Sequence, residues 1–202
     1  MTNKIEKDIV KNLDTSKNYV VALSGGVDSA VLATVVAKQT PNLRSIFVRH
    51  NQKHSKELEE VANKIANNLK INHKALDSNL EENSSETKMR DARYEILYHE
   101  LEDNEILLTG HTLSDKVETF FINLLRGTRV RGLKSIPNMT PRLKRPLLGI
   151  SKDNLINYAK ENNIEYLDDL TNFDNKIIRN WIRNELIPKV DEKFPGDIEE
   201  KI

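Results

Sequence analysis

The alternation of short strand-like segments with helical segments restricts the fold of this chain more than any other feature. The strand-like segments are rich in β-branched, aliphatic or aromatic residues and cover 19–23, 44–48, 71–76 and 105–109. Segments with helical spacing of apolar residues lie between them, over 28–38, 57–69 and 88–101. Strands joined by helices in this way pair in parallel. The pattern therefore predicts an α/β fold, a doubly wound and mainly parallel sheet with helices on both faces.

The later segments continue the pattern, and no linker separates two domains. Helical spacing covers 114–125, 152–161 and 174–186, whereas 127–148 contains three prolines and is expected to be irregular. In open parallel sheets, ligands bind at the carboxyl ends of the strands. We therefore expect the segments that follow the first, second and fourth strands to share one functional rim.

Composition removes several classes of function. The 202 residues contain 31 Lys and Arg and 31 Asp and Glu, so the formal net charge is zero and any polyanionic partner must meet a local patch. The absence of cysteine excludes disulfides, thiolate zinc sites, iron–sulfur clusters and cysteine nucleophiles. No apolar run approaches the roughly 18 residues of a membrane span. We expect a soluble cytoplasmic protein that has no membrane partner.

Residues 24–29, Ser-Gly-Gly-Val-Asp-Ser, lie between the first strand and the first long helix. In that position backbone N–H groups and the helix dipole favour an anion, and two glycines let a phosphate approach the backbone closely. The sequence matches neither G-x-x-x-x-G-K-[ST] nor G-x-G-x-x-G. The alternative is an ordinary Gly-Gly turn in which Asp28 caps the helix.

This hexapeptide resembles the pyrophosphate loop of the ATP pyrophosphatase (PP-loop) superfamily, which has the adenine nucleotide alpha-hydrolase-like fold. The resemblance implies an enzyme that uses ATP and Mg²⁺, cleaves ATP between the α and β phosphates and adenylates a substrate. It also implies that Asp28 helps to place the Mg²⁺. The implied ATP-binding loop residues are Ser24, Gly25, Gly26, Val27, Asp28 and Ser29.

Four further stretches resemble the tRNA(Ile)-lysidine synthase family. Residues 89–94 are similar to its Ala-Arg-x-x-Arg-Tyr element, and 107–127 to its His-His-x-Asp-Asp-Gln-x-Glu-Thr signature. Residues 145–148 match its Arg-Pro-Leu-Leu element, and 169–183 its Asp-x-[ST]-Asn and Arg-Asn-x-[IV]-Arg pair. The chain departs from the signature at three positions, where the second His, the first Asp and the Gln are replaced by Thr112, Ser114 and Lys116.

The resemblance implies that free L-lysine is ligated to the wobble cytidine of a tRNA(Ile) with a CAU anticodon. An adenylated tRNA would be the intermediate, and lysidine, AMP and pyrophosphate the products. Residues 1–190 would form the catalytic domain, including a basic, tRNA-facing segment over 126–145. Residues 191–202 would be a C-terminal tail or the start of a linker, and a homodimer is left open.

The implied catalytic residues are Asp28, Asp115, Glu118 and Arg126. Asp115 and Glu118 are three residues apart on a helix, so both can face one pocket, where they would bind the lysine ammonium and take its proton. Acids are also favoured at a solvated helix N-terminus for electrostatic reasons alone. Arg126 would steady the charge at the α-phosphate.

Three residues at the rim complete the implied nucleotide site, namely His50, Gly110 and His111. His111 has an equally good interpretation as a packing residue. His50 and His54 also suggest a zinc pair, but two histidines without a neighbouring cysteine are weak evidence for zinc.

Between Thr119 and Lys152 the chain contains eight basic residues and no acid, which in a neutral protein indicates a phosphate-backbone footprint. The alternative is a solvated loop that is balanced by acids from elsewhere in the fold. The expected tRNA-binding residues are Arg90, Arg93, Arg129, Arg131, Lys134, Arg145, Arg179 and Arg183.

Two rival classes remain from the sequence. An ammonia-dependent adenylating ligase of the NAD synthetase kind has the same loop but little use for the basic segment. A catalytically silent nucleotide-binding or RNA-binding module is favoured by Ser114. A tRNA thiolase is disfavoured because the chain has no cysteine to handle sulfur.

Overall fold

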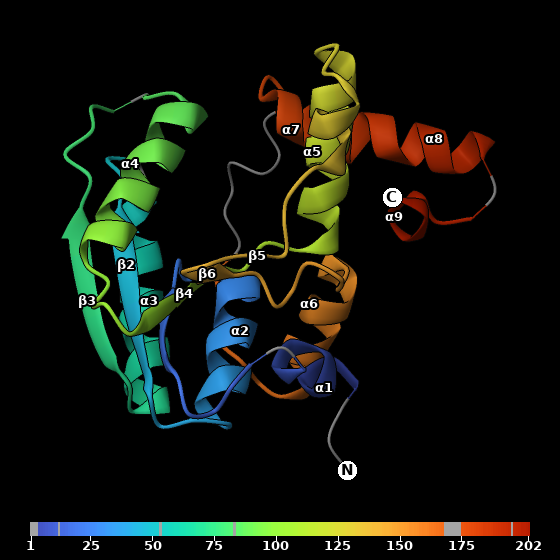
Figure 1. Ribbon diagram of the computed structural model, residues 1–202. Coiled ribbons are helices and arrows are strands. Elements are labelled where there is room, and N and C mark those ends of the chain that lie inside the picture. The colour runs from blue at the N-terminus through green and yellow to red at the C-terminus, as the bar shows by residue number, and fades with distance from the viewer. Residues whose placement is uncertain (1–3, 12, 53, 83, 168–174, 195) are drawn as a thin grey trace.

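The computed structural model describes residues 4–11, 13–52, 54–82, 84–167, 175–194 and 196–202, apart from the side chains of Arg131 and Glu200. Within these ranges the strands form one sheet with the order β3-β2-β1-β4-β6-β5 (Figure 1). The strands are β1 Asn18–Ala22, β2 Leu43–Arg49, β3 Asn72–Asp77, β4 Glu105–Leu108, β5 Met139–Thr140 and β6 Leu143–Lys144. Only the β5–β6 pair is antiparallel.

Helices cover both faces of this sheet. They are α1 Lys4–Val10, α2 Val27–Ala37, α3 Ser55–Leu69, α4 Glu86–His99, α5 Leu113–Leu125, α6 Lys152–Glu161, α7 Ile178–Trp181, α8 Ile187–Lys193 and α9 Ile198–Lys201. A 3₁₀ turn, η1 Val130–Lys134, follows α5, and a π-helical turn, η3 Ile182–Leu186, joins α7 to α8.

The two faces have separate cores because successive side chains of β1 point in opposite directions. Val21 is fully buried among residues of α1, α2, α3 and α6, whereas Val20 packs with Leu97 of α4 and Leu107 of β4. The predicted fold class is therefore confirmed, including the helices on both faces.

The strand order reverses at β1, and the region between the segments that follow β1 and β4 at this switch is here called the crevice. The chain runs from β1 outward to β2 and β3, and then returns to place β4 on the opposite side of β1 (Figure 1). The segments that follow β1 and β4 therefore leave the sheet toward different neighbours. A crevice at such a switch in strand order is where ligands of doubly wound sheets bind.

Three parts of the expected secondary structure differ from the observed one. The region 127–148, expected to be irregular, contains η1 and the two-residue strands β5 and β6, which are too short to show a periodicity. The expected helix 174–186 is broken into α7 and a π turn, and its first residue lies outside the described residues. Helix α1 was not predicted, and it depends on a distant contact, because Glu6 accepts hydrogen bonds from Tyr158 and Lys38 at 2.5 and 2.9 Å.

None of the helices in the described part of the chain combines the length and the apolar character that a bilayer crossing requires.

Candidate nucleotide-binding and catalytic site

The loop over 24–29 is held closed by its two serines. The Ser24 backbone N–H donates to Ser29 Oγ at 3.1 Å, and the two hydroxyl oxygens lie 3.1 Å apart. The Ser29 hydroxyl in turn donates to the Gly26 carbonyl at 3.0 Å. These bonds fix the loop conformation within the chain itself, so the loop is preformed for a ligand.

Two glycines allow close backbone approaches around this loop. Gly25 has a φ of +83°, and a Cβ there would lie 2.5 Å from the Leu58 carbonyl oxygen. A Cβ on Gly110 would lie 3.1 Å from the Ser29 nitrogen. Gly26 differs, because it is the N-cap of α2 and has room for a side chain. The nearest neighbour of a Cβ on Gly26 would be Ser24 Oγ, at 3.8 Å. The first N–H groups of α2, which lack intrahelical acceptors, therefore border open space that suits an anion.

Asp28, in the first turn of α2, has a carboxylate that the protein leaves incompletely bonded. Its Oδ1 is buried and has no hydrogen-bond partner, and its Oδ2 lies 3.9 Å from Lys152 Nζ. Burial raises the pKa of Asp28 to about 6, although Lys152 acts against the rise.

The Asp28 carboxylate fits a Mg²⁺ ion. A hard oxygen donor without a partner beside a phosphate loop is what Mg²⁺ requires, since this ion usually takes one or two carboxylates together with substrate phosphates. The described residues contain no group of three or more His, Cys, Asp or Glu side chains that forms a metal cage by itself. The metal would therefore be held by Asp28 and the nucleotide together.

Asp115 lies across the crevice, at the start of α5, and has two functions there. One oxygen, Oδ2, accepts hydrogen bonds from the Thr112 backbone N–H at 2.8 Å and the Thr112 hydroxyl at 2.9 Å, which completes a capping box. The other oxygen, Oδ1, lies 3.4 Å from Arg179 Nη1. Burial acts to raise the pKa of Asp115, but neighbouring His111, the Thr112 bonds and Arg179 outweigh it and keep that pKa below its ordinary value.

Glu118, one turn further along α5, is completely buried. Its Oε1 accepts a hydrogen bond from Arg183 Nε at 2.6 Å, and its Oε2 lies 3.5 Å from Arg179 Nη1. Burial raises the pKa of Glu118, and the two arginines oppose that rise. Arg179 Nε also lies 3.2 Å from Glu86 Oε1 of α4. Three acids and two guanidinium groups thus form one ion cluster that ties α5 to α4, α7 and η3, and α5 lies beside α7 and η3 in Figure 1.

The two predicted nucleotide-site histidines follow β2 and β4. His50 Nδ1 lies 3.0 Å from Ser78 Oγ, while its Nε2 is buried without a partner. His111 Nδ1 lies 2.9 Å from Thr109 Oγ1. Burial lowers the pKa of both, and that of His111 falls to about 4, so its imidazole is neutral near pH 7.

Four of the predicted tRNA-binding arginines lie inside the crevice or below the surface. Arg179 and Arg183 are drawn onto the acid pair, as described above. Arg93 is desolvated enough that burial lowers its pKa. Arg145 is only 8% exposed, because its guanidinium donates to the Pro137 carbonyl at 2.8 Å and to the Tyr94 hydroxyl at 3.4 Å. Arg145 thus donates its hydrogen bonds within the fold, and its predicted contact with tRNA stays a prediction.

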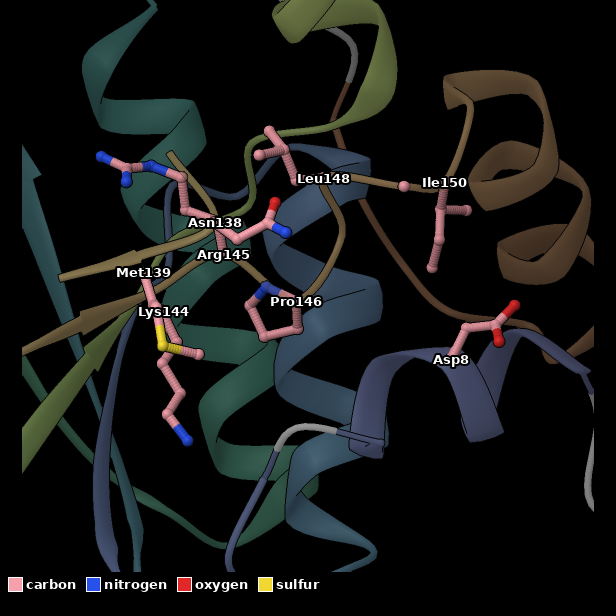
Figure 2. Close-up of a pocket in the computed structure, with 9 residues that line it drawn as sticks. Asp8, Asn138, Met139, Lys144, Arg145, Pro146, Leu148 and Ile150 are labelled. Carbon is pink, nitrogen blue, oxygen red and sulfur yellow. The ribbon is translucent and has the colours of Figure 1, made fainter. Parts of the chain in front are cut away.

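Lys144 and Arg145 are neighbours in the sequence, but their side chains extend in opposite directions. Figure 2 shows Arg145, which directly follows β6, extending away from Lys144. Both residues line a hollow of about 310 Å³, together with Asp8 of α1 and Met139 of β5. No residue of the 24–29 loop lines this hollow, so it is separate from the crevice.

The remaining basic residues gather at the far end of α5. Arg126 caps α5 and is exposed, as are Arg129 and Lys134 of the following turn, while the Arg131 side chain lies outside the described residues. At 1.5 Å per residue, Arg126 is about 16 Å from Asp115 along the helix axis. The structure therefore does not bring Arg126 to the 24–29 loop, as its expected role at the α-phosphate requires. Arg90, the last member of the predicted set, lies with its guanidinium 5.7 Å from the centre of the Tyr94 ring.

The two departures within α5 are both bonded to the C-terminal helix. Ser114 is buried and hydrogen-bonds to Glu199 of α9. Lys116 Nζ donates to the Ile202 carbonyl oxygen at 2.7 Å. These two side chains therefore support α9 and do not face the crevice acids. The family elements over 169–172 lie outside the described residues.

Sequence reasoning missed Lys152 as a neighbour of Asp28 and Thr112 as the cap of α5. The cap had a local signal, because Thr112 precedes Asp115 by three residues in a capping-box pattern. Lys152 had none, because its approach to Asp28 depends on how α6 packs on α2.

Replacement of Asp28 by Asn should stabilise the protein in a pH-dependent way. Because the folded pKa of Asp28 is raised above its unfolded value of 3.8, the carboxyl group stabilises the fold at low pH, and this contribution is lost as pH rises through about 6. The gain in unfolding free energy for Asp28→Asn should therefore grow by about 1 kcal/mol between pH 5 and pH 8. Thermal unfolding at both pH values measures it. Asp103→Asn, at an exposed position, should show no such growth, and equal gains at both pH values would contradict the assignment.

The two loop glycines provide a matched pair of substitutions. Gly25→Ala introduces a side chain at positive φ against the Leu58 carbonyl, whereas Gly26→Ala does neither. We expect Gly25→Ala to lower the unfolding free energy by at least about 1 kcal/mol more than Gly26→Ala. Gly26→Ala should mainly weaken ATP binding, because its methyl group occupies the open anion site. Chemical denaturation and nucleotide titration separate the two effects, and equal stability losses would show that the loop is not strained.

Comparison with known proteins identifies the family of this chain. A family model described as the PP-loop domain matches residues 1–190. The chain is 33% identical to tRNA(Ile)-lysidine synthase of Haemophilus influenzae (strain PittEE), over 96% of this chain and 48% of that protein. It is 39% identical to tRNA(Ile)-lysidine synthase of Buchnera aphidicola subsp. Schizaphis graminum, over 95% of this chain and 45% of that protein. The chain thus spans about half the length of the curated relatives it matches.

A solved structure with the same fold is the U34-tRNA thiolase NcsA from Methanococcus maripaludis with its [4Fe-4S] cluster. It superposes with a TM-score of 0.71 and 19% identity, over 96% of this chain and 74% of that chain. At that identity the similarity concerns the fold alone. The family match, in contrast, covers the closed serine–glycine loop, the Asp28 carboxylate and the acid pair on α5, and we conclude that this chain belongs to the PP-loop family.

Proposed function

We propose that the chain uses ATP to join lysine to the wobble cytidine of a tRNA(Ile) with a CAU anticodon, with release of AMP and pyrophosphate. The observation that carries this proposal is the position of the preformed 24–29 loop, with the unpartnered Asp28 carboxylate, across one crevice from the acid pair Asp115 and Glu118. The names of the similar proteins supply the substrate class.

In the first step, the carbonyl oxygen of cytosine attacks the α-phosphorus of ATP. The bond from that phosphorus to the bridging oxygen breaks, and pyrophosphate leaves into the loop at the start of α2. Transfer of this kind depends on positioning and on stabilising negative charge. Mg²⁺ bound at Asp28 would neutralise part of that charge, and the N–H groups of α2 would hold the released phosphates.

In the second step, the lysine amine attacks the activated carbon of cytosine, a C–N bond forms, and AMP leaves with the former carbonyl oxygen. Free lysine carries an ammonium group with a pKa of about 10.4, so it must be bound and must lose a proton. Asp115 and Glu118 are the proposed lysine-binding pair. Asp115 Oδ1 is the accessible oxygen of the pair, because Glu118 is completely buried and is held by Arg183 at 2.6 Å.

The arginines of the cluster make room for the incoming ammonium. Arg179 contacts the two acids at 3.4 and 3.5 Å, more loosely than Arg183 contacts Glu118. We therefore propose that the lysine ammonium displaces Arg179 from Asp115 and that Asp115 receives the proton as the amine attacks. The adenylate phosphate is the natural new partner for Arg179, since it brings a negative charge into the same crevice.

A single assay tests the proposed reaction. The protein is incubated with ATP, Mg²⁺ and labelled lysine, together with a tRNA(Ile) transcript whose anticodon is CAU. We expect label to enter the tRNA and AMP to form in equal amounts, and a transcript with U at the wobble position should give neither product. Formation of AMP without any RNA would instead indicate a small-molecule ligase, and ATP binding without turnover a silent module.

The exposed basic residues at the end of α5 and in η1 should bind the tRNA backbone. Reversal of two charges, Arg129→Glu with Lys134→Glu, should weaken tRNA binding and lower the slope of log affinity against log salt by roughly 0.7 to 0.9 for each lost phosphate contact. Filter binding at several salt concentrations measures the slope. The control pair Lys17→Glu with Lys70→Glu precedes β1 and β3, at the amino ends of the strands, and should change neither quantity. An unchanged slope in the first variant would show that the tRNA backbone binds to another part of the surface.

Removal of the Asp115 charge should impair the second step more than the first. Asp115→Asn keeps an acceptor for the Thr112 bonds but loses the charge that binds the ammonium, so we expect the lysine requirement to rise about 10- to 100-fold. Adenylated tRNA should still form. Rapid-quench separation of adenylate formation from lysine transfer measures both steps, and Glu95→Gln on α4 is the control. Loss of adenylate formation at an unchanged lysine requirement would assign Asp115 to ATP instead.

A further inference from the structure

The phosphate loop of this chain has no cation of its own. Residues 24–29 contain one acid and no Lys or Arg, whereas the P-loop of many nucleotide-binding proteins ends in a lysine that reaches the phosphates. Pyrophosphate bound at the start of α2 would therefore meet N–H groups, hydroxyls and the negatively charged Asp28. A positive charge must come from another part of the chain.

Lys152 is positioned to supply that charge. It is the first residue of α6, which packs on α2 through the buried side chains of Leu155 and Tyr158. Two residues before Lys152, the backbone carbonyl of Ile150 accepts a hydrogen bond from the Leu113 backbone N–H at 3.0 Å. This bond ties the start of α6 to the start of α5. The backbone of Lys152 is thus fixed between the two helices that border the crevice.

The side chain of Lys152 points at the loop without being bound to it. Its Nζ lies 3.9 Å from Asp28 Oδ2, which is an ion-pair distance and too long for a hydrogen bond. Within the described part of the chain, no hydrogen bond from this ammonium is found, and the side chain is 30% exposed. The ammonium therefore keeps its three donors for a ligand.

The other nearby cations are already engaged. Arg183 lies close enough to Asp28 for the two charges to interact, but it donates to Glu118 at 2.6 Å. Arg126 is at the distant end of α5, and Arg145 is bonded to Pro137 and Tyr94. Among the described residues, Lys152 is thus a cation that lies beside the loop, pairs loosely with Asp28 and makes no hydrogen bond to the protein.

We propose that Lys152 is a catalytic residue that binds the leaving pyrophosphate of ATP, and this proposal rests on the function proposed above. Without a nucleotide, Lys152 is the counter-ion of Asp28. With a metal held at Asp28, the Lys152 ammonium would be available to the β and γ phosphates of a bound nucleotide. It then stabilises the negative charge that develops on pyrophosphate when the bond to the α-phosphorus breaks.

The test compares ligands that contain or lack these phosphates. Calorimetric titration of the whole chain with pyrophosphate in the presence of Mg²⁺, and separately with AMP, is carried out for Lys152→Gln, Lys152→Arg and Lys160→Gln. Lys160 is exposed in the last turn of the same helix, so Lys160→Gln is a control that removes one positive charge at a distance from the loop. Thermal unfolding of each variant monitors folding.

We expect Lys152→Gln to weaken pyrophosphate binding about 10- to 100-fold, since one charged hydrogen bond is lost, and to leave AMP binding within about twofold. Lys152→Arg should retain most of the affinity, and Lys160→Gln should retain all of it. Unchanged pyrophosphate binding in Lys152→Gln, or an equal loss for AMP and pyrophosphate, would overturn the proposal.

The outcome is separable from that of the proposed reaction. Pyrophosphate binding needs neither tRNA nor lysine, so its dependence on Lys152 would stand even if no lysine were joined to tRNA. Turnover adds a second readout, because the loss of Lys152 should lower kcat for AMP formation while the KM for tRNA stays the same.

Discussion

The parallel pairing of β1 with both β2 and β4 is the constraint on which the functional site depends. It places the end of β4 beside the start of α2, so that Gly110 lies against the backbone of Ser29 with no room for a side chain. The same pairing sets the start of α5, and hence Asp115, opposite the phosphate loop. Displacement of β4 would therefore separate the 24–29 loop from the acid pair.

Each acidic side chain in the crevice lies close to a basic side chain. Asp28 is accompanied by Lys152, while Asp115 and Glu118 are accompanied by Arg179 and Arg183. Isolated buried charges are very costly, whereas paired ones are tolerated. Under the proposed function, a triphosphate and an ammonium would enter such a site by exchanging partners with these charged side chains.

Local sequence predicted the parts of the site that depend on local structure. The 24–29 loop lies between a strand and a helix, as the strand, glycine and helix signals around it predicted. The roles of Asp28, Asp115 and Glu118 came from a family resemblance and stay predictions. The placement of Arg145, Arg179 and Arg183 was not predictable in the same way, because a sequence shows that a side chain is charged but not which acid or carbonyl it will meet. Lys152 and helix α1 were missed for the same reason, since contacts over long sequence separations position them. The short strands β5 and β6 likewise depend on their neighbours in the sheet.

The double use of Asp115 has a consequence for how this position can vary. Its Oδ2 completes the cap of α5, while its Oδ1 faces the crevice. A serine or threonine at position 115 would supply one side-chain oxygen in place of two. A glutamate would supply two, but they would lie one methylene further from the backbone. If the proposed function holds, selection for a folded helix and selection for activity act on the same carboxylate. A genetic screen that reads only protein abundance would already mark this position as constrained, and it would do so without detecting any chemistry.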